Sequence, residues 1–172
     1  MSVTITGATG LQRKLKKVEK AISVSPKRLI KTVGEARNRI RKRTNKGHTA
    51  AGGSFKALNS SYAEFKTAKG KSGKPNLHWS GGMLNAMTVK SIKNGAMIYF
   101  NDETERKKAK WHHFGVAPHT IKAKKKKVLS NGMHFFGKEV TVSLPRRSFF
   151  RLGKKIEKYI FTEFRKPIKK AL

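Results

Sequence analysis

Two neighbouring histidines, His112 and His113, are the side chains in this sequence best suited to metal binding or general-base catalysis. Neighbours on a helix project about 100° apart, so the pair is poorly placed to hold one metal ion. Hydrolysis and phosphoryl transfer also call for carboxylates or an activated nucleophile, and the chain has only nine Asp and Glu. We therefore expect one packed and one exposed histidine, with a metal-dependent nuclease as the minor alternative.

The other motifs for enzyme chemistry are incomplete. Gly70-Lys71-Ser72 resembles the end of a nucleotide phosphate loop, but the earlier glycine and the buried strand that precede such a loop are missing. The sequence has no cysteine, which excludes disulfides and thiolate metal sites. It predicts no catalytic residue, no cofactor and no metal, and therefore a protein that is not an enzyme.

The strongest chemical signal is positive charge, because 41 Lys and Arg oppose nine Asp and Glu to give a formal net charge of +32. A domain so charged repels itself, which indicates partners such as nucleic acid or acidic protein surfaces. A run of four lysines between two predicted strands offers point charges, which suit nonspecific phosphate contact better than base reading. The candidate contacts with phosphate or acidic partners are Lys69, Lys71, Lys74, Lys124, Lys125, Lys126, Lys127, Arg146 and Arg147.

The first half of the chain is predicted to consist of two helices followed by a loop. Its 172 residues predict one domain, and no apolar run approaches the roughly 18 residues that span a bilayer, so we expect a soluble protein. Apolar residues at helical spacing predict a helix over residues 11–22. Ser25-Pro26 predicts the cap and first turn of a second helix that reaches about Arg43. The Gly-, Ser- and Lys-rich stretches that follow predict a long, flexible basic loop region over residues 46–76.

Strand signals begin after this loop. Residues 86–92 and 96–100 are strand-like runs joined by Lys93-Asn94-Gly95, in which Asn-Gly supplies the positive φ angles of a tight hairpin. Asp102 predicts the N-cap of a short helix that ends near Gly115.

The last third predicts two more strands, over residues 119–124 and 138–144, and a helix from about Ser148 to Pro167 with Phe149 on its apolar stripe. The aromatic residues of this helix fit core packing better than a stacking platform for single-stranded nucleic acid. The order of elements predicts an α+β fold, an antiparallel β-sheet packed against long N-terminal and C-terminal helices, with a long basic loop. Within the single domain, residues 1–45 are helical, 46–76 form the loop region, and 77–172 carry the sheet and the last helix.

Three short motifs then follow one another along the chain. The first is Phe55-x-x-Leu58-x-x-x-Tyr62-x-x-x-Lys66, continued by Leu77-x-x-Ser80-Gly81-x-Met83; the second is Ala109-Lys110-Trp111-His112-His113-Phe114-Gly115; the third is Leu144-Pro145-Arg146-Arg147-Ser148-Phe149-Phe150. In order and spacing they resemble the tailed-phage virion morphogenesis proteins, the tail-completion or neck family. Three positions depart from the family pattern, with Ser80 in place of Thr, Lys108 in place of Tyr and Ser148 in place of Pro.

Most of these motif residues have structural explanations. We expect Phe114 to fill the core while Gly115 ends the short helix in a left-handed conformation. Pro145 would end a strand, and Phe149 would anchor the helix that follows. Arg147 would bond backbone carbonyls or an acidic neighbour in the next subunit.

The resemblance implies a non-enzymatic virion protein that assembles into a ring, a hexamer, at the joint between capsid connector and tail, around the DNA channel. Its partners would be neighbouring neck or connector proteins and tail-terminator or tail-tube proteins with acidic surfaces, with nonspecific contact to genomic DNA and no membrane. It would lie at the head–tail junction of the virion, and in the host cytoplasm during assembly. A nonspecific nucleic-acid-binding module, for packaging or ribosome association, is the alternative function.

Overall fold

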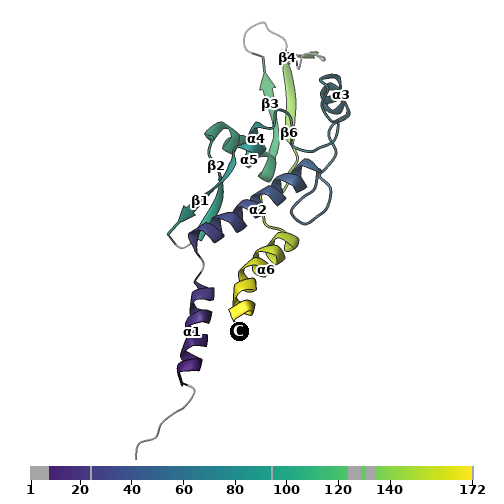
Figure 1. The fold of residues 1–172 in the computed structure, drawn as a ribbon. Helices are drawn as coiled ribbons and strands as arrows, with labels where there is room; N and C mark the ends of the chain where they lie inside the picture. Colours follow the sequence, from purple (N-terminus) through teal and green to yellow (C-terminus); the bar gives the residue numbers. More distant parts are fainter. Residues whose placement is uncertain (1–7, 24, 94, 124–128, 131–134, 172) are drawn as a thin grey trace, which may run out of the picture.

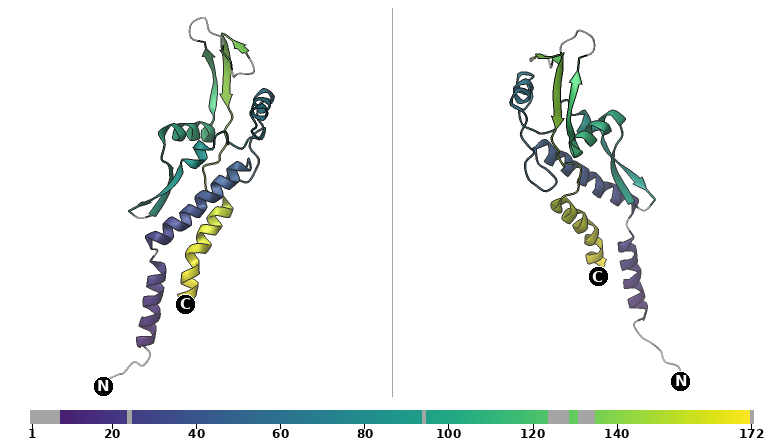
Figure 2. Two further views of the ribbon diagram at one scale, coloured as in Figure 1. Left: turned by 45° about the horizontal axis from the view of Figure 1, so that its top comes forward. Right: turned by 180° about the vertical axis from the view of Figure 1, so that it is seen from behind.

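The chain forms an elongated α+β structure in which a β-ribbon and a helix lie at opposite ends (Figure 1). The computed structural model describes residues 8–23, 25–93, 95–123, 129–130 and 135–171. Helix α1 (Ala8–Ile22) projects from one end of the body, and helix α6 (Lys154–Ala171) runs beside it (Figure 2). The predicted fold class and the terminal helices are confirmed.

Helix α2 (Pro26–Asn45) is the longest element and the support for the rest of the body. It begins as the sequence predicts, because the Ser25 side chain accepts a hydrogen bond from the backbone N–H of Arg28 at 3.3 Å and Pro26 occupies the first helical position. Thr32, Ala36, Ile40 and Thr44 are its buried residues. Their spacing of four places one face of α2 against the hairpin and α6.

The predicted hairpin pairs β1 (Met87–Ile92) with β2 (Gly95–Phe100), in antiparallel register from Met87 opposite Phe100 to Ile92 opposite Gly95. The turn is therefore shorter than predicted, because Gly95 belongs to the second strand and is not among the glycines with positive φ. Asn94 lies outside the described residues.

Helix α5 (Glu103–Phe114) is capped by Asp102, whose carboxylate accepts from the backbone N–H of Glu105 at 2.7 Å. It ends at Gly115, where φ is +81°. A Cβ at this position would lie 2.8 Å from the carbonyl oxygen of Leu144, so both the conformation and the close approach require glycine. A short helix that the sequence did not indicate, α4 (Gly82–Asn85), lies against α5.

The remaining strands form separate ribbons. Strand β3 (Val116–Lys122) pairs with β6 (Glu139–Leu144), and β4 (Leu129–Ser130) pairs with β5 (Phe135–Gly137). Together with the β1–β2 hairpin they make three two-stranded antiparallel sheets in the described part of the chain. The strands pair antiparallel as predicted, but they form separate two-stranded ribbons where the sequence suggested a sheet.

The region 46–76 is also more regular than predicted. It contains helix α3 (Ser60–Ala68), capped by the Asn59 side chain, which accepts from the backbone N–H of Ser61 at 3.0 Å. Lys66 on this helix is buried. The lack of a clear apolar stripe hid α3 in the sequence, since a nine-residue helix capped by Asn reads locally as a polar loop.

The last helix is shifted relative to the prediction. It begins at Lys154, and Pro167 lies inside it, so the prediction that it starts near Ser148 and ends at Pro167 is wrong. Phe149 precedes the helix and is fully buried, with 0% of its surface exposed. The core around it consists of Ala36, Ile40, Phe55, Met83, Leu84, Met87, Ala109 and Ile156.

Candidate functional site

The second and third motifs lie against each other at the junction of α5 with the segment that leads into α6. The backbone N–H of Arg147 donates to the carbonyl oxygen of His112 at 2.8 Å, and the backbone N–H of Phe150 donates to Nδ1 of His113 at 3.3 Å. The rings of His113 and Phe149 meet edge to face with centroids 5.9 Å apart. The histidine pair therefore holds the third motif in place through its backbone and its rings.

Lys66 of the first motif lies near Arg147 of the third motif. Lys66, His112, His113 and Arg147 are together called the motif cluster below. The ammonium group of Lys66 belongs to a residue only 3% exposed, and it donates to the carbonyl oxygen of Lys74 and to Oδ1 of Asn76, both at 3.1 Å. These bonds close the loop after α3. Burial lowers the pKa of Lys66, and the nearby charge of Arg147 lowers it further.

Arg147 is the second buried cation of this cluster, also 3% exposed. Burial lowers its pKa, and its Nε has no hydrogen-bond partner among the described residues. No ion pair formed within the described ranges involves Arg147 or Lys66. Two like charges buried together destabilise each other. Arg147 is thus buried within the single chain and is not part of its exposed basic surface.

The pKa values of both histidines are lowered. Burial, together with the charge of Arg147, lowers the pKa of His112 to about 4, and its Nδ1 has no hydrogen-bond partner in the described structure. Burial also lowers the pKa of His113, helped by Arg146 and Arg151. Both rings are half-buried, which corrects the expectation of one packed and one exposed histidine. Among the described residues, no three His, Asp or Glu are grouped to hold a metal ion.

The candidate contact residues separate into three groups. Lys69, Lys71, Lys74 and Arg146 are exposed, while Arg147 is buried. The four lysines Lys124, Lys125, Lys126 and Lys127 lie outside the described residues. Lys74 and Arg147 both lie near Lys66, Lys74 through its backbone carbonyl oxygen and Arg147 through its charge. The structure does not bring the described basic candidates together in one site.

The structural motif residues divide between core and surface. Phe55, Gly81 and Phe149 are buried, Leu58 and Pro145 are half-buried, and Ser80 is exposed. The prediction that Phe114 fills the core is wrong, because 62% of Phe114 is exposed, and Trp111 is 53% exposed. Phe149 occupies the core position instead, since α5 turns its Ala109 face inward.

Arg43 is a structural residue that the sequence did not single out. Its Nη2 donates to the carbonyl oxygens of Phe149 at 2.7 Å and of Arg151 at 2.8 Å. These bonds fix the segment between the third motif and α6 onto the end of α2. In the sequence Arg43 is one of many cations in a basic run, and nothing in its local pattern distinguishes it.

The surface charge stays largely uncompensated within the chain. The ion pairs between described residues involve five basic side chains, Arg106, Lys107, Lys108, Lys122 and Lys166. Four of these pairs are local contacts within one helix, three or four residues apart, and so contribute little stability.

Comparisons with known proteins agree with the motifs. No curated protein and no solved structure matched the chain, and no helix in the described ranges is long and apolar enough to cross a membrane. A model of the phage virion morphogenesis family matches residues 7–168, a span that contains all three motifs and every described helix and strand except the last turn of α6. The chain therefore belongs to the phage virion morphogenesis family, whose proteins serve in building the phage particle.

Proposed function

We propose that this protein is a structural subunit of the head–tail joint, where six copies form a ring around the DNA channel between capsid connector and tail. It carries out no reaction of its own in this role. Membership of the virion morphogenesis family supports a role in the particle. The amount of surface that a single chain leaves uncovered carries the proposal of a ring.

The accessible surface of one chain is 13,100 Å². A compact monomer of 19.3 kDa would expose about 8,500 Å², so this chain exposes about 4,600 Å² more than its mass requires. A standard interface buries about 800 Å² per partner. The excess is enough for two neighbours in a ring and further partners above and below.

Large apolar side chains occupy part of this surface. Phe161 is 66% exposed, Phe114 62%, Leu15 59% and Trp111 53%. Single exposed apolar residues are ordinary, but four this large on an extended body favour burial against other subunits.

The charge of such a ring calls for acidic protein partners as well as DNA. Six copies at +32 each would carry +192. A compact chain of this length would be about 40 Å across. Duplex DNA has one charge per roughly 1.7 Å, so a ring of that height encloses about 24 phosphates, and one twice as tall about 47. DNA in the channel is therefore too small a counterion, and acidic surfaces on the adjoining neck and tail proteins supply the remainder.

Native mass spectrometry of the full chain, alone and mixed with the structural proteins encoded beside it, tests this function. We expect a closed ring of one stoichiometry that is stable at physiological salt and present in purified virions. A chain that stays monomeric in every mixture and is absent from the virion would refute the proposal.

The net charge of +32 also supports a second candidate, a nonspecific nucleic-acid-binding module. Such a module would bind free duplex as a monomer. With six to ten phosphate contacts, its affinity would fall by about 10³ to 10⁵ between 50 and 200 mM salt. A salt titration with a short duplex separates the candidates, because ring formation through apolar contacts has no such dependence.

A further inference from the structure

Two hollows, of about 440 Å³ and about 260 Å³, lie along α2 between the β1–β2 hairpin and α6. Together they are called the groove below. Pro26 and Leu29 line the first, and Val33, Ala36 and Ile40 line the second. The two hollows therefore follow one another along the single apolar stripe of α2.

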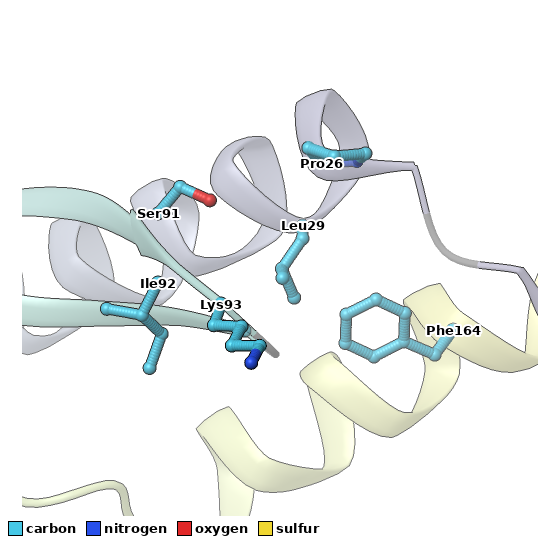
Figure 3. Close-up of a pocket in the computed structure, with 7 residues that line it drawn as sticks. Pro26, Leu29, Ser91, Ile92, Lys93 and Phe164 are labelled. Carbon is cyan, nitrogen blue, oxygen red and sulfur yellow. The ribbon is translucent and has the colours of Figure 1, made fainter.

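The other walls are mostly apolar, with Ser91 and Lys93 of the hairpin as the polar residues of the first hollow. In the first hollow, Leu29 on α2 and Phe164 on α6 point toward a shared space beside Lys93 of the hairpin, and Ile92 lies farther along the same wall (Figure 3). In the second, Ile98 of β2 and Ile160 of α6 are the corresponding residues. Ala36 and Ile40 at the floor of the second hollow are buried in the core. The side chains above them, such as Leu29, Ile160 and Phe164, are only partly buried by the described residues.

The dimensions of the groove fit one helix. From Pro26 to Ile40 the helical rise is about 21 Å, the length of a helix of about fifteen residues. Binding of an amphipathic helix in an apolar groove is a recurrent mode of protein recognition.

The charges around the groove determine which helix fits. Lys93 lines the first hollow and Arg151 the second, and no Asp or Glu is among the described residues that line either one. Two more cations bridge α2 and α6, because Arg28 lies 5.9 Å from the Phe164 ring centroid and Arg39 lies 4.0 Å from that of Tyr159. A second copy of this chain would bring further positive charge, whereas an acidic helix would gain from every one of these cations.

We infer that this groove docks an acidic amphipathic helix of a neighbouring protein. The apolar face of that helix packs against the partly exposed Leu29 and Val33 of α2 and Phe164 of α6, and its carboxylates face Lys93 and Arg151. The inference deepens the proposed function, since it locates one of the acidic contacts that the ring requires. The groove places the docked helix across α2, α6 and the hairpin at once.

A designed peptide tests the site without the natural partner. The probe is a stapled helix of about fifteen residues with leucine every three or four positions on one face and glutamate on the other faces. Its binding to the full chain is measured by fluorescence anisotropy at physiological salt. A scrambled peptide of the same composition and a peptide with glutamine in place of glutamate are the matched controls.

Two groove variants, Leu152→Ser and Lys93→Glu, are compared with Phe161→Ser and Lys69→Glu. Leu152 and Lys93 line the hollows, whereas Phe161 and Lys69 are exposed elsewhere. We expect each groove variant to weaken binding about tenfold, the two control variants to stay within about twofold of the natural chain, and both control peptides to bind more weakly.

Three results would overturn the docking site. The first is that the scrambled peptide binds as tightly as the designed one. The second is that all four variants lose the same amount of peptide affinity. The third is that the groove variants form a smaller oligomer of the chain itself, which would assign the groove to a second copy. A normal ring combined with absent peptide binding would reject the groove alone, while loss of the ring and of the virion location would reject the proposed function.

Discussion

Arg28 donates a hydrogen bond through Nη2 to the backbone carbonyl oxygen of Glu163. That carbonyl lies four residues before Pro167, which has no N–H to bond it. The guanidinium group of α2 thus replaces the donor that the proline removes from α6. It also lies 5.9 Å from the ring centroid of Phe164, so one side chain joins the two helices by a hydrogen bond and a cation–π contact.

Because Arg28 supplies the hydrogen-bond donor that Pro167 lacks, substitutions at positions 28 and 167 should have coupled effects on stability. Arg28→Ala should lower the free energy of unfolding by about 1–2 kcal/mol, because it leaves the Glu163 carbonyl without a partner. In a Pro167→Ala background the loss should be smaller, because the backbone N–H that this substitution restores can donate to the same oxygen. Urea unfolding of the four chains in this double-mutant cycle measures the coupling.

Lys27→Ala is the control for this cycle, since the exposed neighbour makes none of these contacts. It should change stability by less than about 0.5 kcal/mol in either background. Equal losses from Arg28→Ala with proline and with alanine at position 167 would show that the two residues act independently.

The helix ends show how far local rules can predict this fold. Ser25-Pro26 and Asp102 determine helix starts through bonds within a few residues, so the sequence predicts α2 and α5 correctly. Helix α6 continues past Pro167 with the help of a cation that lies 135 residues before the carbonyl it bonds. A local reading of proline as a helix end cannot anticipate such a partner.

Gly153 should tolerate no side chain. A Cβ there would lie within van der Waals overlap of the backbone carbonyl oxygen of Ala50 and 3.0 Å from Nη1 of Arg43. The two segments are already joined, because the backbone N–H of Ala50 donates to the carbonyl oxygen of Ser148 at 2.9 Å. Gly153→Ala must move one backbone away from the other and should cost about 1–3 kcal/mol of stability.

The same substitution at Gly34 should have the opposite effect on the free energy of unfolding. A Cβ at Gly34 meets nothing within 4 Å, and the position is inside α2. The substitution should raise the free energy of unfolding by about 0.5–1 kcal/mol. Thermal unfolding that moves the two variants in the same direction would contradict the packing at Gly153.

Alanine substitutions at two phenylalanines should differ in their stability cost, because one residue is in the core and the other is exposed. Phe149 is 0% exposed and Phe161 is 66% exposed, so Phe149→Ala should cost about 3–5 kcal/mol of stability, and Phe161→Ala less than about 0.5 kcal/mol. Chemical denaturation of the monomer measures both. A similar cost for the two substitutions would mean that Phe161 is covered in solution.

The motif cluster was predictable in its residues but not in its burial. The sequence marked Lys66, His112 and Arg147 as motif positions and named Arg147 as a candidate contact with phosphate or an acidic partner, but it did not predict that Lys66 and Arg147 are buried. Burial of Lys66 depends on acceptors in the loop after α3, such as the Lys74 carbonyl, and burial of Arg147 depends on packing between segments far apart in the sequence, such as its backbone bond to His112. Neither appears in local composition, and the exposed Phe114 shows the converse error for an apolar residue.

His112 should make the protein less stable in mild acid. Burial lowers its pKa from 6.5 to about 4 in the folded chain, so between these values the unfolded chain binds more protons. The free energy of unfolding should therefore fall as the pH decreases from about 7 to about 5, by about 2 kcal/mol, and His113 adds to the fall because burial lowers its pKa too. Below the folded pKa the contribution of His112 is fully lost and changes no further. Urea unfolding at each pH measures the slope, which His112→Leu should reduce. An undiminished slope in His112→Leu would mean that this ring is free to take up a proton in the folded chain, contrary to its place between Arg147 and the core.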